Sequence, residues 1–93
     1  MLSPDPLISV SPAYITVEAY VLVRVRSGEE ELVDYLRRQP HVVEAKIVYG
    51  EYDVVVKARV KDIKELSRLV LEEIRKRFDV ERTSTLIVVR ESE

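Results

Sequence analysis

The chain has 93 residues and a mass of 10.8 kDa, which is the size of one small domain. Apolar residues make up 46% of it and charged residues 34%, which is too apolar for a disordered chain and too charged for a membrane protein. The absence of cysteine excludes disulfides, thiolate metal sites and cysteine nucleophiles. The net charge of −2 argues against DNA or RNA as the main partner, because nucleic-acid binders usually carry a basic surplus.

Residues 1–17 differ from the rest of the sequence. Three prolines interrupt them, and they lack the basic start and long apolar stretch of a secretion signal. We therefore expect an irregular N-terminal arm over 1–17, one domain over 18–93, and a cytoplasmic location. The sequence also has no asparagine and only one glutamine beside abundant Glu and Arg, a composition typical of a thermophile.

The first predicted elements are a strand and a helix. Apolar side chains alternate along Glu18–Arg26, and several of them are β-branched, which predicts a strand. Ser27 followed by Glu30 has the spacing of a capping box. The helix that this predicts runs to about Arg38 and stops before a proline.

Two strands, a helix and a last strand are predicted next. Val42–Tyr49 alternates, and Val54–Val60 follows after a connection too short for a helical crossover, so these two strands form an antiparallel hairpin. Asp62 and Glu65 repeat the cap spacing, which predicts a helix over Ile63–Arg77 with an inward stripe of Ile63, Leu66, Leu69, Val70 and Ile74. Val80–Arg90 is predicted as the closing strand.

The order β-α-β-β-α-β is the ferredoxin-like pattern, an α+β sandwich in which two helices cover one face of a four-stranded antiparallel sheet. The helix-facing set is expected to be the most apolar one: Val21, Val23, Val25, Ala45, Ile47, Val54, Val56, Ala58, Val60, Ile87 and Val89.

The second face of the sheet (the open face) carries six large apolar side chains: Tyr20, Leu22, Val48, Val55, Leu86 and Val88. Charged residues accompany them: Arg24, Glu44, Lys46, Lys57, Arg59 and Arg90. Glu44 is expected to offset Lys46, Lys57 or Arg59. So many apolar groups on one open face are unusual for a monomer. We therefore expect the sheets of two protomers to pack face to face into a dimeric α/β barrel.

Few residues suggest catalysis. His41 is the only histidine, no cluster has metal-ligand spacing, and no phosphate-binding glycine loop occurs, so no metal or cofactor is expected. The run Tyr49-Gly50-Glu51-Tyr52-Asp53 is more informative, because the glycine permits close approach of a ligand and Asp53 offers a carboxylate. Ordinary hairpin-turn chemistry also explains this run. The hydroxyls of Thr83–Thr85 can bind a carboxylate or an amine, or serve only as strand residues.

Together these segments resemble the effector domain of Lrp/AsnC regulators, also called RAM. The resemblance covers about 18–91 and rests on the strand–Gly-x-x-Asp–strand run of 42–56, on the closing strand from Val80 to Val89, and on the opening run 19–23. No single motif is specific, but the ordered set of three is.

The resemblance implies dimers formed sheet to sheet, assembly of dimers into octamers, and amino-acid effectors bound in crevices between dimers. Matched to the motifs, the ligand-binding residues are Tyr49, Gly50, Tyr52, Asp53, Thr83 and Thr85. It implies that Asp53 meets the effector's amino group and that Gly50 and the hydroxyls meet its carboxylate. It implies no catalytic residues.

One departure from the family is visible. Family regulators carry an N-terminal helix-turn-helix, and the 17 proline-containing residues before the first strand do not accommodate one. The chain resembles the stand-alone form of the domain. We therefore expect it not to bind DNA directly, and to act as an amino-acid sensor or in mixed assemblies with full-length regulators.

Three alternatives share this topology. A small enzyme of the dimeric ferredoxin-like barrel type needs polar groups between sheet and helices, where we expect only apolar ones. An RNA-binding module stacks bases on aromatic residues of the central strands, where only Tyr20 is present. An ACT domain also binds amino acids but pairs its sheets side by side.

Overall fold

The computed structural model describes residues 16–89, so the predicted arm of residues 1–17 lies almost entirely outside the described part. The elements are β1 (Val17–Val25), α2 (Glu29–Leu36), β2 (Val42–Ile47), β3 (Val54–Val60), α3 (Ile63–Arg68), η1 (Leu69–Arg75) and β4 (Val80–Ile87). The predicted β-α-β-β-α-β order is confirmed. The four strands form one antiparallel sheet in the order β2-β3-β1-β4.

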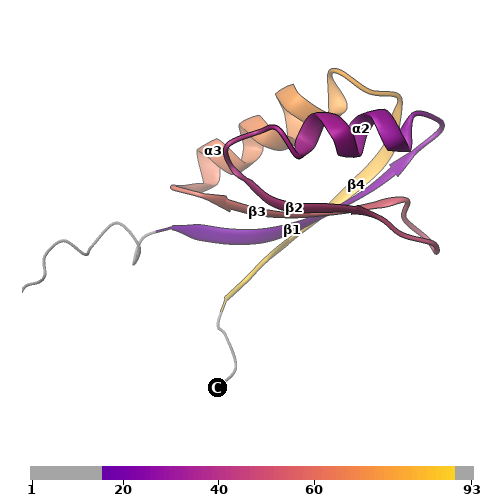
Figure 1. The fold of residues 1–93 in the computed structure, drawn as a ribbon. Coiled ribbons are helices and arrows are strands. Elements are labelled where there is room, and N and C mark those ends of the chain that lie inside the picture. Colours follow the sequence, from indigo (N-terminus) through magenta and orange to yellow (C-terminus); the bar gives the residue numbers. More distant parts are fainter. Residues whose placement is uncertain (1–15, 90–93) are drawn as a thin grey trace, which may run out of the picture.

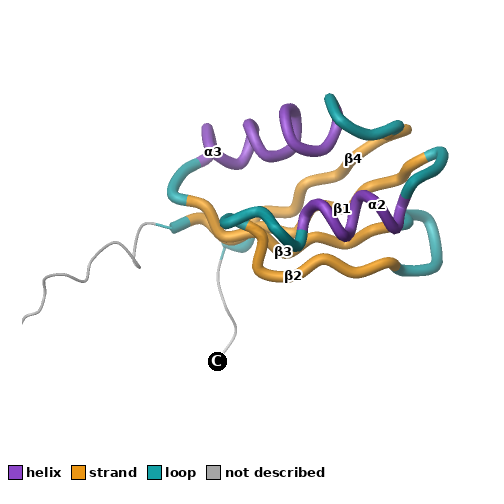
Figure 2. Tube along the Cα trace, turned by 45° about the horizontal axis from the view of Figure 1, so that its top comes forward, coloured by secondary structure: helices purple, strands orange, loops and turns teal. Residues whose placement is uncertain are grey.

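Both helical segments lie on the same face of the sheet, as Figures 1 and 2 show. Alternate residues of the central strands β1 and β3 point toward them and are buried: Ala19, Val21, Val23, Val25, Val54, Val56, Ala58 and Val60. Leu32 and Leu36 of α2, Leu66 of α3, and Leu69 and Ile74 of η1 complete the core. Period-two patterning therefore identifies the buried face of these strands correctly. None of the described helices is long and apolar enough to cross a membrane.

Four residues predicted to face the core are largely exposed: Ile47, Ile63, Ile87 and Val89. Ile47 and Ile87 lie at the ends of β2 and β4, the two edge strands, and Val89 follows β4. Ile63 begins α3. The helices cover the centre of the sheet and leave these positions at its margin uncovered. The prediction of burial was wrong there because the apolar pattern predicts which side a residue faces, and it does not predict whether another element covers that residue.

The start of α2 also differs from the prediction. The N-cap is Gly28, in the left-handed region at φ 86°, and no side chain caps the helix, so the predicted Ser27–Glu30 capping box is wrong. Gly28 directs the chain from β1 into the helix in a conformation that costs little only for glycine. Three glutamates, Glu29, Glu30 and Glu31, occupy the first turn, where the helix dipole favours negative charge.

The start of α3 confirms its prediction. The Asp62 side chain accepts a hydrogen bond from the Glu65 N–H at 2.8 Å, and the Glu65 carboxylate accepts one from the Lys61 N–H at 2.7 Å. The second helix then continues as the π-helix η1 up to Arg75. The sequence pattern did not predict this change of pitch. The second helix is continuous from Ile63 to Arg75 and lies over the same face of the sheet as α2.

Candidate ligand-binding loop

The loop between β2 and β3, residues 48–53, is held at its base by hydrogen bonds. The Val48 N–H donates to the Asp53 carbonyl at 2.8 Å, which closes the loop, and the Asp53 N–H donates to the Val23 carbonyl at 2.9 Å. The Asp53 carboxylate oxygen Oδ2 also accepts from the Val25 N–H at 3.0 Å. Asp53 thus joins the loop to the end of β1, and one of its two carboxylate oxygens is occupied by this structural role.

Arg24 holds the tip of the loop. Its Nη1 donates to the carbonyl oxygens of Gly50 at 3.1 Å and Glu51 at 2.9 Å. Its Nε lies 3.8 Å from the carboxylate of Glu81, on the neighbouring strand. The sequence pattern predicts only that Arg24 is one of the charged residues of the open face. Its position at the last outward site of β1, beside a glycine loop, is the signal that would have identified this role.

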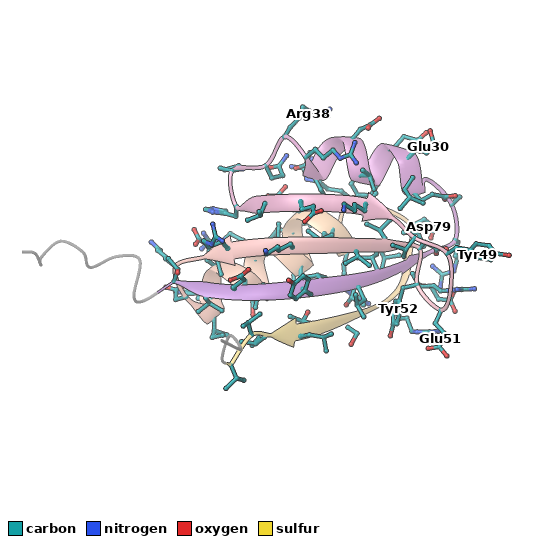
Figure 3. All side chains as sticks on the ribbon, turned by 60° about the horizontal axis from the view of Figure 1, so that its bottom comes forward. Glu30, Arg38, Tyr49, Glu51, Tyr52 and Asp79 are labelled. Atoms are coloured by element: carbon teal, nitrogen blue, oxygen red, sulfur yellow. The ribbon has the colours of Figure 1, made fainter. Side chains whose placement is uncertain are left out.

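The two tyrosines of the loop behave differently. Tyr49 is fully exposed and points away from the molecule at the end where the loop lies (Figure 3). Tyr52 lies against β4, with the Arg82 guanidinium 5.2 Å from its ring centroid. A hydrogen bond with Tyr52 raises the pKa of Arg82 above its ordinary value. Gly50 leaves open space where a Cβ would be. Tyr49 and Gly50 are therefore the parts of the loop most available to another molecule.

Thr83 and Thr85 lie on β4, on the side of the sheet that faces the helices. They pair with Val23 and Val21 of β1, and directly opposite residues of an antiparallel pair share a face. The Thr83 hydroxyl lies 3.3 Å from Nη1 of Arg75 in η1. Val54, Val23 and Thr83 form one row across three strands, so Thr83 is about 10 Å from the strand that begins where the loop ends.

In one protomer the six predicted ligand residues lie in two groups, and Thr85 pairs with Val21 in the middle of β1, away from the loop end of the sheet. The first group is the loop: Tyr49, Gly50, Tyr52 and Asp53. The second group, Thr83 and Thr85, lies on the helix side of β4. The two groups belong to strands that β1 separates, since the loop leads into β3 and the threonines lie on β4.

The histidine lies elsewhere. His41 precedes β2, and its carbonyl accepts from the Arg59 N–H, which places it at the end of the sheet opposite the loop. Its Nε2 is 3.0 Å from the Glu65 carboxylate. Within residues 16–89, no group of three or more His, Cys, Asp or Glu side chains is arranged to hold a metal ion.

The open face of the sheet has a hollow of about 220 Å³ lined by Tyr20, Val48 and Val55 together with three charged residues. Two ion pairs join charged residues on this face. Lys46 is 2.7 Å from Glu44, and Lys57 is 3.2 Å from Glu18. The hydrogen bond from Lys46 holds the pKa of Glu44 below its ordinary value, and the hydrogen bond to Glu18 raises the pKa of Lys57. The expected partner of Glu44 is thus Lys46.

The comparisons with known proteins agree with the resemblance. A family model of the Lrp/AsnC ligand binding domain matches residues 18–93. The HTH-type transcriptional regulator FL11 from Pyrococcus horikoshii is 38% identical over 73 residues, which cover 77% of this chain and 48% of the regulator. The chain thus spans about half the length of the curated relatives it matches.

Two solved structures extend the comparison. A protein from Thermus thermophilus is 36% identical, with a TM-score of 0.77, over 83% of this chain and 98% of that one. A Neisseria meningitidis transcriptional regulator, solved as a complex with L-Met, is 21% identical with a TM-score of 0.77, over 100% of this chain and 62% of that one, and this likeness shows the fold alone. On the family match and the identity to these relatives, the chain belongs to the Lrp/AsnC ligand-binding domain family.

Proposed function

We propose that the chain is a non-enzymatic, cytoplasmic regulatory module that binds an amino acid and responds through its assembly state. Its curated relatives are transcriptional regulators, and a regulator of the same fold was solved with L-Met. The observation that carries the proposal is the arrangement of the loop, where β1 and Arg24 fix the backbone while Tyr49 and Gly50 remain open to a ligand.

The open face is proposed as the dimer interface. Tyr20, Val48 and Leu86 are exposed there, and Leu22, Val55 and Val88 are half-buried. Exposed apolar area of this kind favours association, because burying it releases about 25 cal/mol per Å². The two ion pairs on this face leave no net charge from these four residues, so they do not oppose the packing of a second sheet.

The ligand site is proposed to be completed between protomers. The loop and the two threonines lie in separate groups in one protomer, so a crevice formed with a neighbouring dimer has to supply the remaining contacts. We propose that in such a crevice Asp53 Oδ1 meets the amino group of the effector. The hydroxyls of Thr83 and Thr85 are proposed to donate to its carboxylate. Octamers formed from four dimers fit this arrangement.

We further propose that residues 18–93 take part in regulation without binding DNA themselves. The charge of −2 over the whole sequence offers no basic surplus for phosphates. Full-length Lrp/AsnC regulators are the proposed partners, joined through the same open face. The buried core contains only apolar side chains among the described residues, which favours a binding module over an enzyme with a pocket between sheet and helices.

The experiment is a thermal-shift screen of the common amino acids, combined with molar mass by light scattering with and without each hit. We expect a dimer or larger assembly, and a rise in melting temperature with at least one amino acid. At a ligand concentration of 100 times Kd, binding adds about 2.7 kcal/mol of stability. A double variant, Thr83→Val with Thr85→Val, should keep the assembly and lose the shift. A stable monomer, or no shift with any amino acid, contradicts the proposal.

A further inference from the structure

Two arginines stand opposite each other on β1 and β4 at the loop end of the sheet. Arg24 and Arg82 are a directly opposite pair, so both side chains lie on the open face. Like charges in directly opposite positions destabilise a pair of strands. The two arginines therefore need a compensating negative charge.

Each of these arginines holds a different part of the β2–β3 loop. Arg24 donates to the carbonyl oxygens of Gly50 and Glu51 at the loop tip. The Arg82 guanidinium lies 5.2 Å from the ring centroid of Tyr52. Figure 3, a view of the open face, shows Glu51 and Tyr52 at this end of the sheet. Both arginines therefore contribute to the position of the loop.

Glu81 forms an ion pair with both guanidiniums, one through each carboxylate oxygen. Its Oε1 is 3.8 Å from Nε of Arg24, and its Oε2 is 3.8 Å from Nη1 of Arg82. Among residues 16–89, it is the only acid that forms an ion pair with either arginine. The hydrogen bond with Tyr52 raises the pKa of Arg82, and the negative charge of Glu81 adds to this increase. One carboxylate thus offsets the repulsion between the two cations that hold the loop.

An irregularity in β4 gives Glu81 this position. Arg24 pairs with Arg82, and the next residue of β1, Val25, pairs with Val80, so Glu81 is an extra residue on β4. In an uninterrupted strand, neighbouring side chains point to opposite faces, and Glu81 would lie on the helix side. A bulge redirects a side chain in this way, and bulges are common next to functional sites. Here the bulge brings the carboxylate to the two guanidiniums of the open face.

We propose that Glu81 is a positioning residue for the ligand loop, because it offsets the charges of Arg24 and Arg82 and so lets both arginines hold the loop at once. The link to a ligand rests on the proposed function, whereas the effect on the loop can be measured without a ligand. All three charged side chains are partly exposed, so dissolved salt should screen the repulsion between the arginines.

The test measures how often the loop opens, by chymotrypsin cleavage of the full chain after Tyr49 or Tyr52. When opening is fast relative to cleavage, the cleavage rate follows the population of the open loop. Glu81→Gln should be cleaved about three- to fivefold faster than the unaltered chain, in keeping with the modest strength of exposed ion pairs. Asp79→Asn is the matched control, because it removes the same charge from the 3.0 Å ion pair with Arg26, which includes no loop residue.

Two further conditions separate an effect of charge from an effect of packing. The ratio of the cleavage rates of Glu81→Gln and the unaltered chain should fall toward one in 1 M salt, where the screening length is about 3 Å. Glu81→Asp keeps the charge and should stay closer to the unaltered chain than Glu81→Gln does. Equal cleavage of Glu81→Gln and Asp79→Asn, or a ratio that salt does not change, overturns the proposal.

The link to ligand binding is measured separately. For an amino acid that raises the melting temperature of the unaltered chain, the rise should be smaller in Glu81→Gln and unchanged in Asp79→Asn, because a loop that opens more often binds less tightly. Equal rises in all three proteins overturn the role of Glu81 in positioning the loop for a ligand. An absence of any rise in the unaltered chain contradicts the proposed function instead, and the cleavage ratios then still decide whether Glu81 holds the loop.

Discussion

The carboxylate of Asp53 accepts a hydrogen bond from the backbone N–H of Val25 at 3.0 Å, across 28 positions of sequence. The Asp53 N–H also donates to the Val23 carbonyl, so the exit of the β2–β3 loop is fixed to the end of the central strand β1. Only one carboxylate oxygen makes the bond to Val25. A residue proposed to meet a ligand is therefore also part of the framework that positions the loop.

These two roles of Asp53 predict different effects for two substitutions. Asp53→Ala leaves the N–H of Val25 without an acceptor and should lower the free energy of unfolding by about 1–3 kcal/mol. Asp53→Asn retains an acceptor oxygen and should cost less than half as much, while removing the negative charge proposed to meet an amino group. Urea unfolding measures the first effect and the amino-acid thermal shift the second. Equal destabilisation by both variants contradicts the structural role.

The open face and the helix side can be compared on one strand. Leu86 and Ile87 are adjacent on β4, with similar exposures of 51% and 45%, and face opposite sides of the sheet. Leu86→Asp should dissociate the proposed dimer. Because a two-fold axis places Leu86 of both protomers in the interface, the substitution removes two leucines, each worth about 1.5 kcal/mol or more. Association should therefore weaken by at least about 100-fold.

Ile87→Asp is the control for this prediction, since it introduces the same charge on the side away from the proposed interface. Light scattering over a range of protein concentrations measures both variants. We expect Ile87→Asp to keep the molar mass of the unaltered chain. Dissociation by Ile87→Asp, with Leu86→Asp remaining associated, would place the interface on the helix side.

The sequence predicts the fold well where residue spacing and structure have the same period. Alternation along β1 and β3 identifies the buried face, and Asp62 with Glu65 marks the start of α3, because both signals depend only on nearby residues. It fails for Val43, which alternates with Ala45 in the sequence but is exposed, whereas Ala45 is buried. The register of β2 against β3 shifts between Val42 and Glu44, and an irregularity of this kind interrupts the alternation.

The candidate site was less predictable for a related reason. Gly50 and Asp53 stand out as turn residues in the sequence, but the contacts that hold their loop come from Arg24, 26 and more positions away. Strand register decides such contacts, and a one-residue slip would turn Arg24 to the other face. The π-helical continuation of the second helix likewise has no marker in its apolar spacing.

Gly28 gives a direct test of the corrected helix start. Its φ of 86° lies in the left-handed region, so Gly28→Ala should lower the free energy of unfolding by about 1–2 kcal/mol. For a domain of this size, that shifts the melting temperature by about 4–8 °C per kcal/mol. Gly28→Asn should cost less, since asparagine tolerates this region. If Ser27→Ala destabilised the chain more than Gly28→Ala, the side-chain cap predicted from the sequence would be reinstated.

The contact between the two helices predicts a pH dependence. The Tyr35 hydroxyl of α2 donates to the Glu73 carboxylate of η1, and this hydrogen bond raises the pKa of Tyr35 above its ordinary value. Only the protonated phenol can donate. The stabilisation is therefore fully present below the unfolded-state pKa of about 10 and is lost as the pH rises through the folded-state value.

Tyr35→Phe should therefore destabilise the chain near neutral pH, and the difference from the unaltered chain should shrink toward about pH 11. Urea unfolding near neutral pH and at about pH 11 measures this difference. Tyr49→Phe, which alters an exposed ring, is the control and should not change the free energy of unfolding at either pH. Phe at position 35 keeps the ring packing on Phe78, 5.6 Å away between centroids, so only the hydroxyl is tested. A difference that stays constant at alkaline pH would assign the contribution of Tyr35 to something other than its hydrogen bond with Glu73.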